Sequence, residues 1–283
     1  MKHKKFKNPI VSVLIVALIG FFTSISYIPH AAALKLTAKR IFFEGRTRSE
    51  NLLIINETNE EQTYRISWEE RKMGPTGGLK PLSQNEIDAM GIKASDMVKY
   101  SPRRVTLAPQ QSQHIRLALR RPGDLPDGEY RSHLRISTEP KPRKNKGTPT
   151  GRLGATIDVD PAITIPVYVR KGNLEGSLNI SDLNASMISA DTLNIKFRMN
   201  REGNKSIYAR TDMICNMLSP NAYILRSLKW IPIYTDTAYR QRAFNVKIPE
   251  GQPLCRSVSI RMHDADSERT ILLAEGTADV YTQ

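Results

Sequence analysis

Short segments in which apolar and polar residues alternate recur along most of the sequence, and they restrict its fold more than any other feature. The clearest of them span residues 63–69, 114–120, 130–137, 193–199, 244–248 and 258–262. Glycine, proline, asparagine or aspartate residues flank each segment, as is typical of strand ends. Because alternate side chains of a strand point to opposite faces, each segment can bury one face and leave the other in solvent. Many short strands of this kind predict an all-β protein built of sandwiches.

The chain of 283 residues is long enough for one or two domains. A polar stretch at residues 170–173 separates one series of predicted strands from a second series. We therefore expect two β-sandwich domains, formed by residues 34–170 and 171–283, each within the usual size range of a domain.

The first 33 residues have the layout of a secretory signal peptide. Four lysines lie within residues 2–7, an apolar run follows over residues 9–25, and residues 31–33 form a small-residue cleavage pattern of three alanines. The alternative is a membrane anchor, because about 20 apolar residues can span a bilayer, but this run is slightly shorter. We expect cleavage after Ala33 and export to an oxidising compartment. No later segment is long and apolar enough to span a membrane, so no stable insertion of the mature chain is expected.

Cys215 and Cys255 are the two cysteines of the chain. In an oxidising compartment such a pair most simply forms one disulfide. The alternative of two buried free thiols stays open, because spacing alone does not fix the pairing. Two cysteines cannot supply a four-thiolate zinc site.

Sequence motifs of enzymes and metal sites are missing. There is no G-x-S-x-G, H-E-x-x-H or P-loop motif. The histidines of the mature chain, His114, His133 and His263, lack the spacing of metal ligands. We therefore expect neither an enzyme nor a bound cofactor or metal.

The formal net charge of +14 falls to +10 without residues 1–33, which carry four lysines and no acidic residue. The basic side chains are spread along the predicted strands, as on solvated faces, and an exported protein rarely meets nucleic acid. We therefore expect no nucleic-acid partner. An anionic envelope surface is the weak partner that this charge allows.

One predicted strand is unusually long. From Ile157 to Val169 the apolar residues keep a period of two, interrupted at Pro161. Pro161 and Pro166 favour an edge strand, because proline has no N–H for a ladder hydrogen bond. An exposed apolar edge can pair with another chain. The alternative is two consecutive strands, or one bent strand, buried within the protein's own sandwich. The preceding residues 139–154 contain prolines and a basic cluster, which predict a solvated loop.

Five segments of the first predicted domain form an ordered set: Arg40–Gly45, Ile55–Thr58, Tyr100–Pro109, Ile115–Leu117 and Leu125–Leu134. Together they resemble the PapD-like periplasmic chaperones of pilus assembly. The resemblance covers residues 34–172 and is weak beyond them. It implies two immunoglobulin-like domains in a boomerang arrangement, and a location in the periplasm.

The resemblance also implies a function. Chaperones of this family bind pilus or fimbrial subunits, whose immunoglobulin-like fold lacks one strand, and lend them an edge strand in donor-strand complementation. The subunits then pass to an outer-membrane usher for assembly. In this sequence Ile157 and Val159 are expected to fill the subunit's groove, with Leu153 as a further anchor. Ile163 closes the donor segment, at the point where the strand is expected to enter the protein's own core.

The family binds the C-terminal carboxylate of the subunit with two basic residues between its domains. Arg40 matches the first, since it directly precedes a predicted strand and a guanidinium can bind a carboxylate through two hydrogen bonds. The second is a lysine in the family, but Pro166 occupies the corresponding position here. Arg170 is therefore the candidate for the second anchor, with Lys171 and Arg104 as alternatives. This departure implies a divergent branch of the family.

Two other functions stay open at the level of sequence. An exported structural or adhesive immunoglobulin-like protein of the envelope would have the same strands and the same signal peptide. A basic module that binds the envelope surface would lose its partner steeply as the salt concentration rises.

Overall fold

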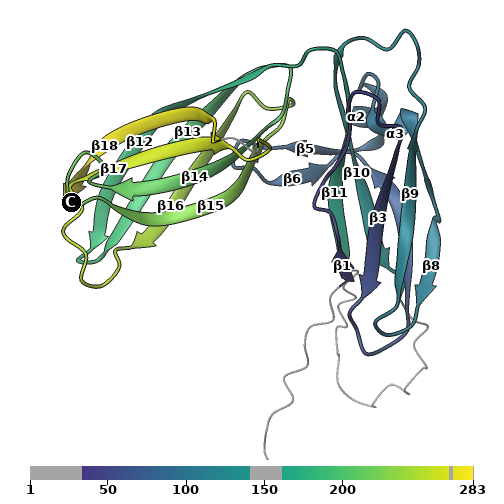
Figure 1. The fold of residues 1–283 in the computed structure, drawn as a ribbon, viewed down its shortest axis with the longest axis horizontal. Coiled ribbons are helices and arrows are strands. Elements are labelled where there is room, and N and C mark those ends of the chain that lie inside the picture. The colour runs from purple at the N-terminus through teal and green to yellow at the C-terminus, as the bar shows by residue number, and fades with distance from the viewer. Residues whose placement is uncertain (1–33, 141–160, 268–269, 283) are drawn as a thin grey trace, which may run out of the picture.

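The computed structural model describes residues 34–140, 161–267 and 270–282 of the chain. The predicted signal peptide, residues 1–33, lies outside these ranges, as do residues 141–160 with most of the predicted loop. Nearly all regular structure consists of strands, arranged in two β-sandwiches that meet at an angle (Figure 1). The predicted all-β fold, with two immunoglobulin-like domains in a boomerang arrangement, is therefore confirmed.

The first sandwich packs a four-stranded sheet against a five-stranded sheet. The four-stranded sheet has the order β1 (Leu34–Leu36), β3 (Ser49–Asn56), β9 (Ser112–Leu119) and β7 (Val98–Ser101). The five-stranded sheet has the order β2 (Ile41–Phe43), β11 (Ala162–Lys171), β10 (Gly128–Thr138), β4 (Gln62–Glu69) and β8 (Arg104–Leu107). Alternate apolar side chains of both sheets, among them Leu52, Ile115 and Leu134, are fully buried in one core.

The start of the first sandwich is divided between its two sheets. β1 pairs antiparallel with β3, whereas β2 pairs parallel with β11. Residues 37–40 make the crossing, so Arg40 lies immediately before β2. β2 is three residues long and pairs with β11 only at Val167–Val169. It therefore covers only part of the edge of β11.

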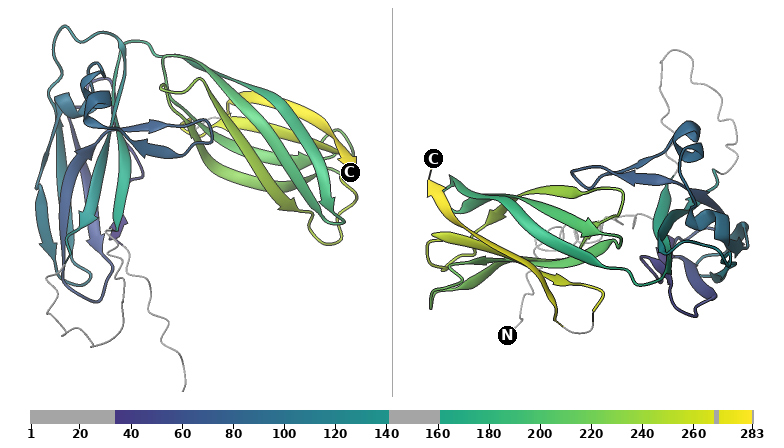
Figure 2. Two further views of the ribbon diagram at one scale, coloured as in Figure 1. Left: turned by 180° about the vertical axis from the view of Figure 1, so that it is seen from behind. Right: turned by 90° about the horizontal axis from the view of Figure 1, so that it is seen from above.

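The chain between β4 and β7 forms a hairpin and two short helices. β5 (Arg71–Met73) pairs with β6 (Leu79–Pro81), and this hairpin projects from the first sandwich toward the second (Figure 2). α2 (Gln84–Asp88) and α3 (Ala94–Met97) follow. The apolar residues of α3 join the first core and fix this segment against the sandwich.

The second sandwich is built from the remaining strands. One layer contains β12 (Gly176–Ser189), β13 (Thr192–Gly203) and β16 (Tyr239–Lys247). The other contains β14 (Ile207–Cys215), β15 (Tyr223–Ile233), β17 (Ser257–Asp264) and β18 (Leu272–Thr282). A short parallel pairing of β12 with β18 joins the two layers. Their inner faces bury a second core, which includes Leu193, Ile195 and Ile260.

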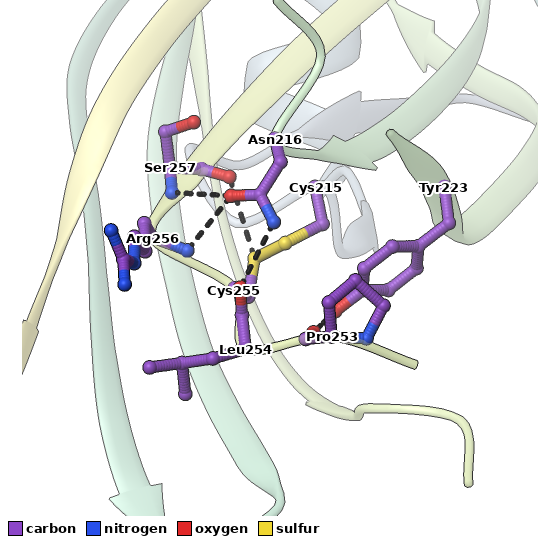
Figure 3. Close-up of a disulfide and its surroundings, with 8 residues drawn as sticks. All are labelled: Cys215, Asn216, Tyr223, Pro253, Leu254, Cys255, Arg256 and Ser257. Atoms are coloured by element: carbon purple, nitrogen blue, oxygen red, sulfur yellow. Dashed lines mark hydrogen bonds between the residues drawn. A yellow bond between two sulfur atoms is a disulfide. The ribbon is translucent and has the colours of Figure 1, made fainter. Parts of the chain in front are cut away.

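A disulfide joins Cys215, at the end of β14, to Cys255 in the loop before β17 (Figure 3). Both cysteines lie in the second core, and their Cα atoms are 5.5 Å apart, within the usual range for a disulfide. Asn216 holds the same loop, because its Oδ1 accepts the N–H of Arg256 at 2.9 Å and its Nδ2 donates to the carbonyl of Leu254 at 2.9 Å. The predicted pairing is confirmed, and the alternative of two free thiols is not the one found.

Candidate functional site

The five-stranded sheet of the first sandwich turns one face toward the second sandwich. Val167 and Val169 of β11 lie in the first core, so Tyr168 between them points to the opposite face. Tyr168 is opposite Phe42 in the pairing with β2 and opposite Arg131 in the pairing with β10. We call this surface the interdomain face; it consists of Phe42, Arg131, His133, Tyr168 and Arg170.

Tyrosines from both sandwiches form the centre of the contact. The hydroxyl oxygen of Tyr168 lies 2.7 Å from that of Tyr208 on β14. The ring of Phe42 stacks on Tyr168 with the centroids 5.0 Å apart, and Tyr234, which follows β15, meets Tyr168 edge-on at 6.3 Å. Burial raises the pKa of both Tyr168 and Tyr208. Both hydroxyls therefore stay protonated at neutral pH, and their hydrogen bond is between uncharged groups.

Arg40 approaches this aromatic cluster from the first sandwich. Its guanidinium carbon lies 4.1 Å from the ring centre of Tyr208 and 5.4 Å from that of Phe42. Its Nη2 forms an ion pair with Oδ1 of Asp266, in the loop after β17 of the second sandwich. The Arg40 side chain is 19 % exposed. The arginine predicted as an anchor is thus partly enclosed between the two sandwiches and still reachable from solvent.

Arg170 lies on the same interdomain face, and its charge is already paired. Its Nε donates to Oε2 of Glu129 at 2.8 Å, and its Nη1 pairs with Oε1 of Glu44. Its guanidinium carbon lies 4.5 Å from the ring centre of Phe42, so Arg40 and Arg170 share one aromatic ring. Among the described residues, Nη2 of Arg170 has no hydrogen-bond partner. The two predicted anchors are therefore close together, but the charge of Arg170 is already paired with Glu129 and Glu44, and its unpartnered Nη2 is buried.

The two alternatives for the second anchor have partners elsewhere. The ammonium group of Lys171 donates to the carbonyl of Leu125. Arg104 pairs with Glu139 at 2.6 Å and lies on β8, at the opposite edge of the sheet from β2. Arg170 is the better of the three candidates by position.

A second ion pair joins the sandwiches at Arg131. Its Nη2 lies 2.7 Å from Oδ2 of Asp236, and its guanidinium carbon lies 4.0 Å from the ring centre of Tyr234. The same carboxylate oxygen accepts the backbone N–H of Met73 at 3.0 Å, which ties the β5–β6 hairpin to the second sandwich. No pattern in the sequence singles out this pair. Arg131 lies in an alternating strand, where a basic residue usually marks a solvated face, and no local pattern connects it with Asp236.

One edge of β11, which we call the open edge, has no partner strand in the described ranges over half its length. β11 pairs with β10 throughout but with β2 only at Val167–Val169. The N–H of Thr138 donates to the carbonyl of Pro161, so the odd-numbered residues of β11 direct their backbone groups toward β10. Ala162, Thr164 and Pro166 therefore direct theirs to the other side, where no strand of the described ranges pairs with them.

Arg40 lies at the end of this open edge. Ile41 is level with Val167 in the parallel pairing, so continuing the register by one residue places Arg40 level with Pro166. Pro166 has no N–H, and β2 begins at Ile41. A partner strand that ran parallel to β11 along the open edge would therefore end with its C-terminus beside Arg40.

The predicted donor-strand residues are divided by the limits of the described ranges. Leu153, Ile157 and Val159 lie outside them. Ile163 lies on β11, where it is half-buried and packs against the first core. The part of the donor segment that the structure describes is thus anchored in the protein's own sandwich, and the capture role of all four residues stays a prediction.

Comparison with known proteins gives a structural likeness and no sequence match. No protein-family model matches the sequence, and no curated protein matches it. The chain is similar to the CupB2 chaperone of Pseudomonas aeruginosa, at 12 % identity over 87 % of this chain and 98 % of that chain, with a TM-score of 0.43. The E. coli chaperone DraB gives 14 % identity over 89 % and 97 %, with a TM-score of 0.40.

A third similar structure is the complex of the Salmonella enterica SafA pilin with the SafB chaperone, at 14 % identity over 87 % and 96 % and a TM-score of 0.38. Each of these three structures is or contains a chaperone, and the sequence resembles chaperones of pilus assembly. Identities and TM-scores this low carry no argument about function, which has to be inferred from the chain's own residues. None of the helices in the described ranges is long and apolar enough to cross a membrane.

Proposed function

We propose that the protein is a periplasmic chaperone that binds pilus or fimbrial subunits through the open edge of β11. The observation that carries this proposal is the position of Arg40 at the end of that edge. Ala162 and Thr164 have backbone groups that no strand of the described ranges pairs with, and a strand parallel to β11 would bring its terminal carboxylate to the guanidinium. A partner that adds a strand at this edge and ends in a free carboxylate would make both contacts at once.

In this proposal the donor segment continues from β11 to lower residue numbers. Ile157 and Val159 would fill the partner's groove, with Leu153 as a further anchor and Ile163 as the join to the first core. Residues 34–170 would form the capturing domain and 171–283 the second immunoglobulin-like domain. Residues 1–33 would direct export to the periplasm, and an outer-membrane usher would receive the captured subunit.

The backbone contact can be tested at Thr164. Thr164→Pro removes an N–H that points away from β10, so the ladder within the sheet stays intact while pairing at the open edge is blocked. Thr164→Ala keeps the N–H and is the matched control. We expect the protein isolated from the periplasm to carry a bound pilus or fimbrial subunit. Mass spectrometry identifies the bound polypeptide. The alanine variant should retain this polypeptide and the proline variant should lose it.

The charged contact can be tested at Arg40. Arg40→Ala should weaken binding of the same polypeptide about 10- to 100-fold, because hydrogen bonds to charged groups contribute about 1.5–3 kcal/mol. Arg40→Lys should be intermediate, since an ammonium group cannot form the paired hydrogen bonds of a guanidinium. Binding that is unchanged by Thr164→Pro and by Arg40→Ala, or a protein retained in the outer-membrane fraction with no polypeptide bound, would contradict the proposal.

A further inference from the structure

The proposed carboxylate anchor already holds a carboxylate of the protein itself. Asp266 reaches from the second sandwich to Arg40, and the two side chains are 21 % and 19 % exposed. The ring of Tyr208 lies beneath the guanidinium at 4.1 Å. Asp266 therefore occupies the place beside Arg40 where the terminal carboxylate of a partner strand would bind.

Backbone hydrogen bonds hold the loop that carries Asp266 in this position. The N–H of Asp266 donates to Oδ1 of Asp264 at 2.8 Å, and the N–H of Ala265 donates to the carbonyl of Tyr208 at 2.8 Å. The N–H of Asp264 in turn donates to the carbonyl of Ile271 at 2.9 Å. The contact between Asp266 and Arg40 is thus prepared by the fold of the second sandwich.

A cavity beside Asp266 offers its side chain a second position, away from Arg40. This cavity has a volume of about 400 Å³ and is lined in addition by Lys205 and Ser206. Burial raises the pKa of Asp266 most, and the nearby carboxylate of Asp264 raises it further, whereas Arg40 and, to a smaller degree, Arg170 and Lys205 lower it. Lys205 is therefore a second cation near the carboxylate, and it would partly offset the repulsion from Glu175 and Asp264, which line the same cavity, if the side chain rotated away from Arg40.

We propose that Asp266 is an internal competitor that fills the Arg40 site in the free protein and leaves it when a partner's terminal carboxylate arrives. This inference rests on the proposed function. Asp266 holds Nη2 of Arg40, and two carboxylates at the same nitrogen repel each other, so the incoming group competes with Asp266 for that nitrogen. A small free carboxylate has only its charge to offer, whereas a strand adds backbone hydrogen bonds along β11. Asp266 thereby restricts the Arg40 site to ligands that combine a strand with a terminal carboxylate.

Access to Arg40 can be measured without any partner. The mature protein is treated with phenylglyoxal, which modifies exposed guanidinium groups, and the rate at Arg40 is read by mass spectrometry. We expect a several-fold faster reaction in Asp266→Asn, and the same in Asp266→Ser as a second variant. Asp236→Asn is the matched control, since it makes the same change of charge in the other ion pair between the sandwiches. Equal rates in the wild type and Asp266→Asn, or an equal acceleration in Asp236→Asn, would overturn the proposal.

Competition is measured with a nine-residue peptide of alternating threonine and valine, made with a free or an amidated C-terminus. We expect Asp266→Asn to bind the free-acid peptide about tenfold more tightly than the wild type does and to leave the amide unchanged. The wild type and Asp266→Asn could bind the free-acid and amidated peptides equally well while their phenylglyoxal rates at Arg40 still differ. In that case Arg40 is not a carboxylate anchor, and both that part of the proposed function and the competition by Asp266 are wrong. If the acid is preferred equally by both proteins, the anchor stands and the role of Asp266 is refuted.

Discussion

His133 lies fully buried on the interdomain face, and neither of its ring nitrogens has a hydrogen-bond partner among the described residues. Its ring centre lies 6.2 Å from that of Tyr234. Burial, followed by the nearby charges of Arg131 and Arg71, lowers the pKa of His133 to about 3. The imidazole is therefore neutral in the folded protein at pH values above about 3.

This burial predicts a loss of stability in acid. In the unfolded chain the imidazole has a pKa of about 6.5, so between that pH and about 3 the unfolded state binds a proton that the folded state does not. The free energy of unfolding should fall as the pH drops through this window, by up to about 4 kcal/mol at its lower end. Urea denaturation at pH 7, 5.5 and 4 measures this fall in the free energy of unfolding.

A histidine elsewhere on the sandwich provides the control for this prediction. His133→Gln should flatten the dependence on pH, whereas His114→Gln, at an exposed position of β9, should leave it unchanged. An equal fall in stability for His133→Gln and the wild type would show that other groups cause the acid sensitivity.

Some residues of the candidate site could be predicted from the sequence, and others could not. Arg40 could be found because it sits in a short segment that resembles a family pattern. Asp266 and Asp236 could not, because each meets its arginine across the interface from more than 100 positions away in the chain. Charge pairs of this kind depend on how two domains are placed, which no local periodicity records.

At the scale of elements, the β5–β6 hairpin links the two sandwiches. The N–H of Gln241 on β16 donates to the carbonyl of Pro75 at 2.7 Å. Gly77 has a φ of +86°, and a Cβ at this position would lie 2.0 Å from Nε of Arg240. The tip of the hairpin therefore needs glycine for two reasons, its backbone conformation and the guanidinium packed against it.

Gly77→Ala should loosen this contact. The methyl group must displace Arg240, whose Nη1 donates to the carbonyl of Pro232 at 2.6 Å, and the backbone becomes strained. We expect a loss of about 1–2 kcal/mol beyond that of Gly45→Ala, which has a positive φ but open space around it. Hydrogen exchange of the Gln241 amide should accelerate in Gly77→Ala and not in Gly45→Ala. Similar exchange in both variants would mean that the hairpin tip does not hold β16.

Strands whose sequences alternate clearly between large apolar and polar residues were predictable, and strands without this pattern were not. The segments at 63–69, 130–137 and 193–199 correspond to β4, β10 and β13. β12, β14 and β15 were not predicted. β12 mixes serine and asparagine with its apolar residues, and much of β15 is exposed, so neither has a regular period of two. Their pairing comes from neighbouring strands of the second sandwich, which a single segment does not specify.

At the scale of the whole molecule, the Arg131–Asp236 pair couples the two sandwiches. The Arg131 side chain is 8 % exposed, so its charge depends on Asp236. Asp236→Ala should cost about 3 kcal/mol of stability, because it leaves a buried charge without its partner. Glu57→Ala, which removes an ion pair with Lys35 whose side chains are 37 % and 59 % exposed, should cost less than about 1 kcal/mol. Urea denaturation of both variants measures the difference, and equal losses would contradict the coupling.

The overall architecture was the part that the sequence predicted best. Two series of short strands indicated two sandwiches, and the resemblance of residues 34–172 added their boomerang arrangement. The contacts that hold the arrangement, the tyrosine cluster and the ion pairs at Arg40 and Arg131, form only when the sandwiches meet. In the sequence, nothing distinguishes the residues that make these contacts from other residues of strands and loops.

Pro166 and the three-residue β2 have a consequence for how a bound strand could be released. If the protein functions as proposed, they would close one end of the exposed flank of β11, so one strand would be exchanged for another starting from the other end. A rival segment would peel the first one away stepwise toward Arg40. The backbone ladder would come apart first, and the terminal charge would be the last point of attachment to let go.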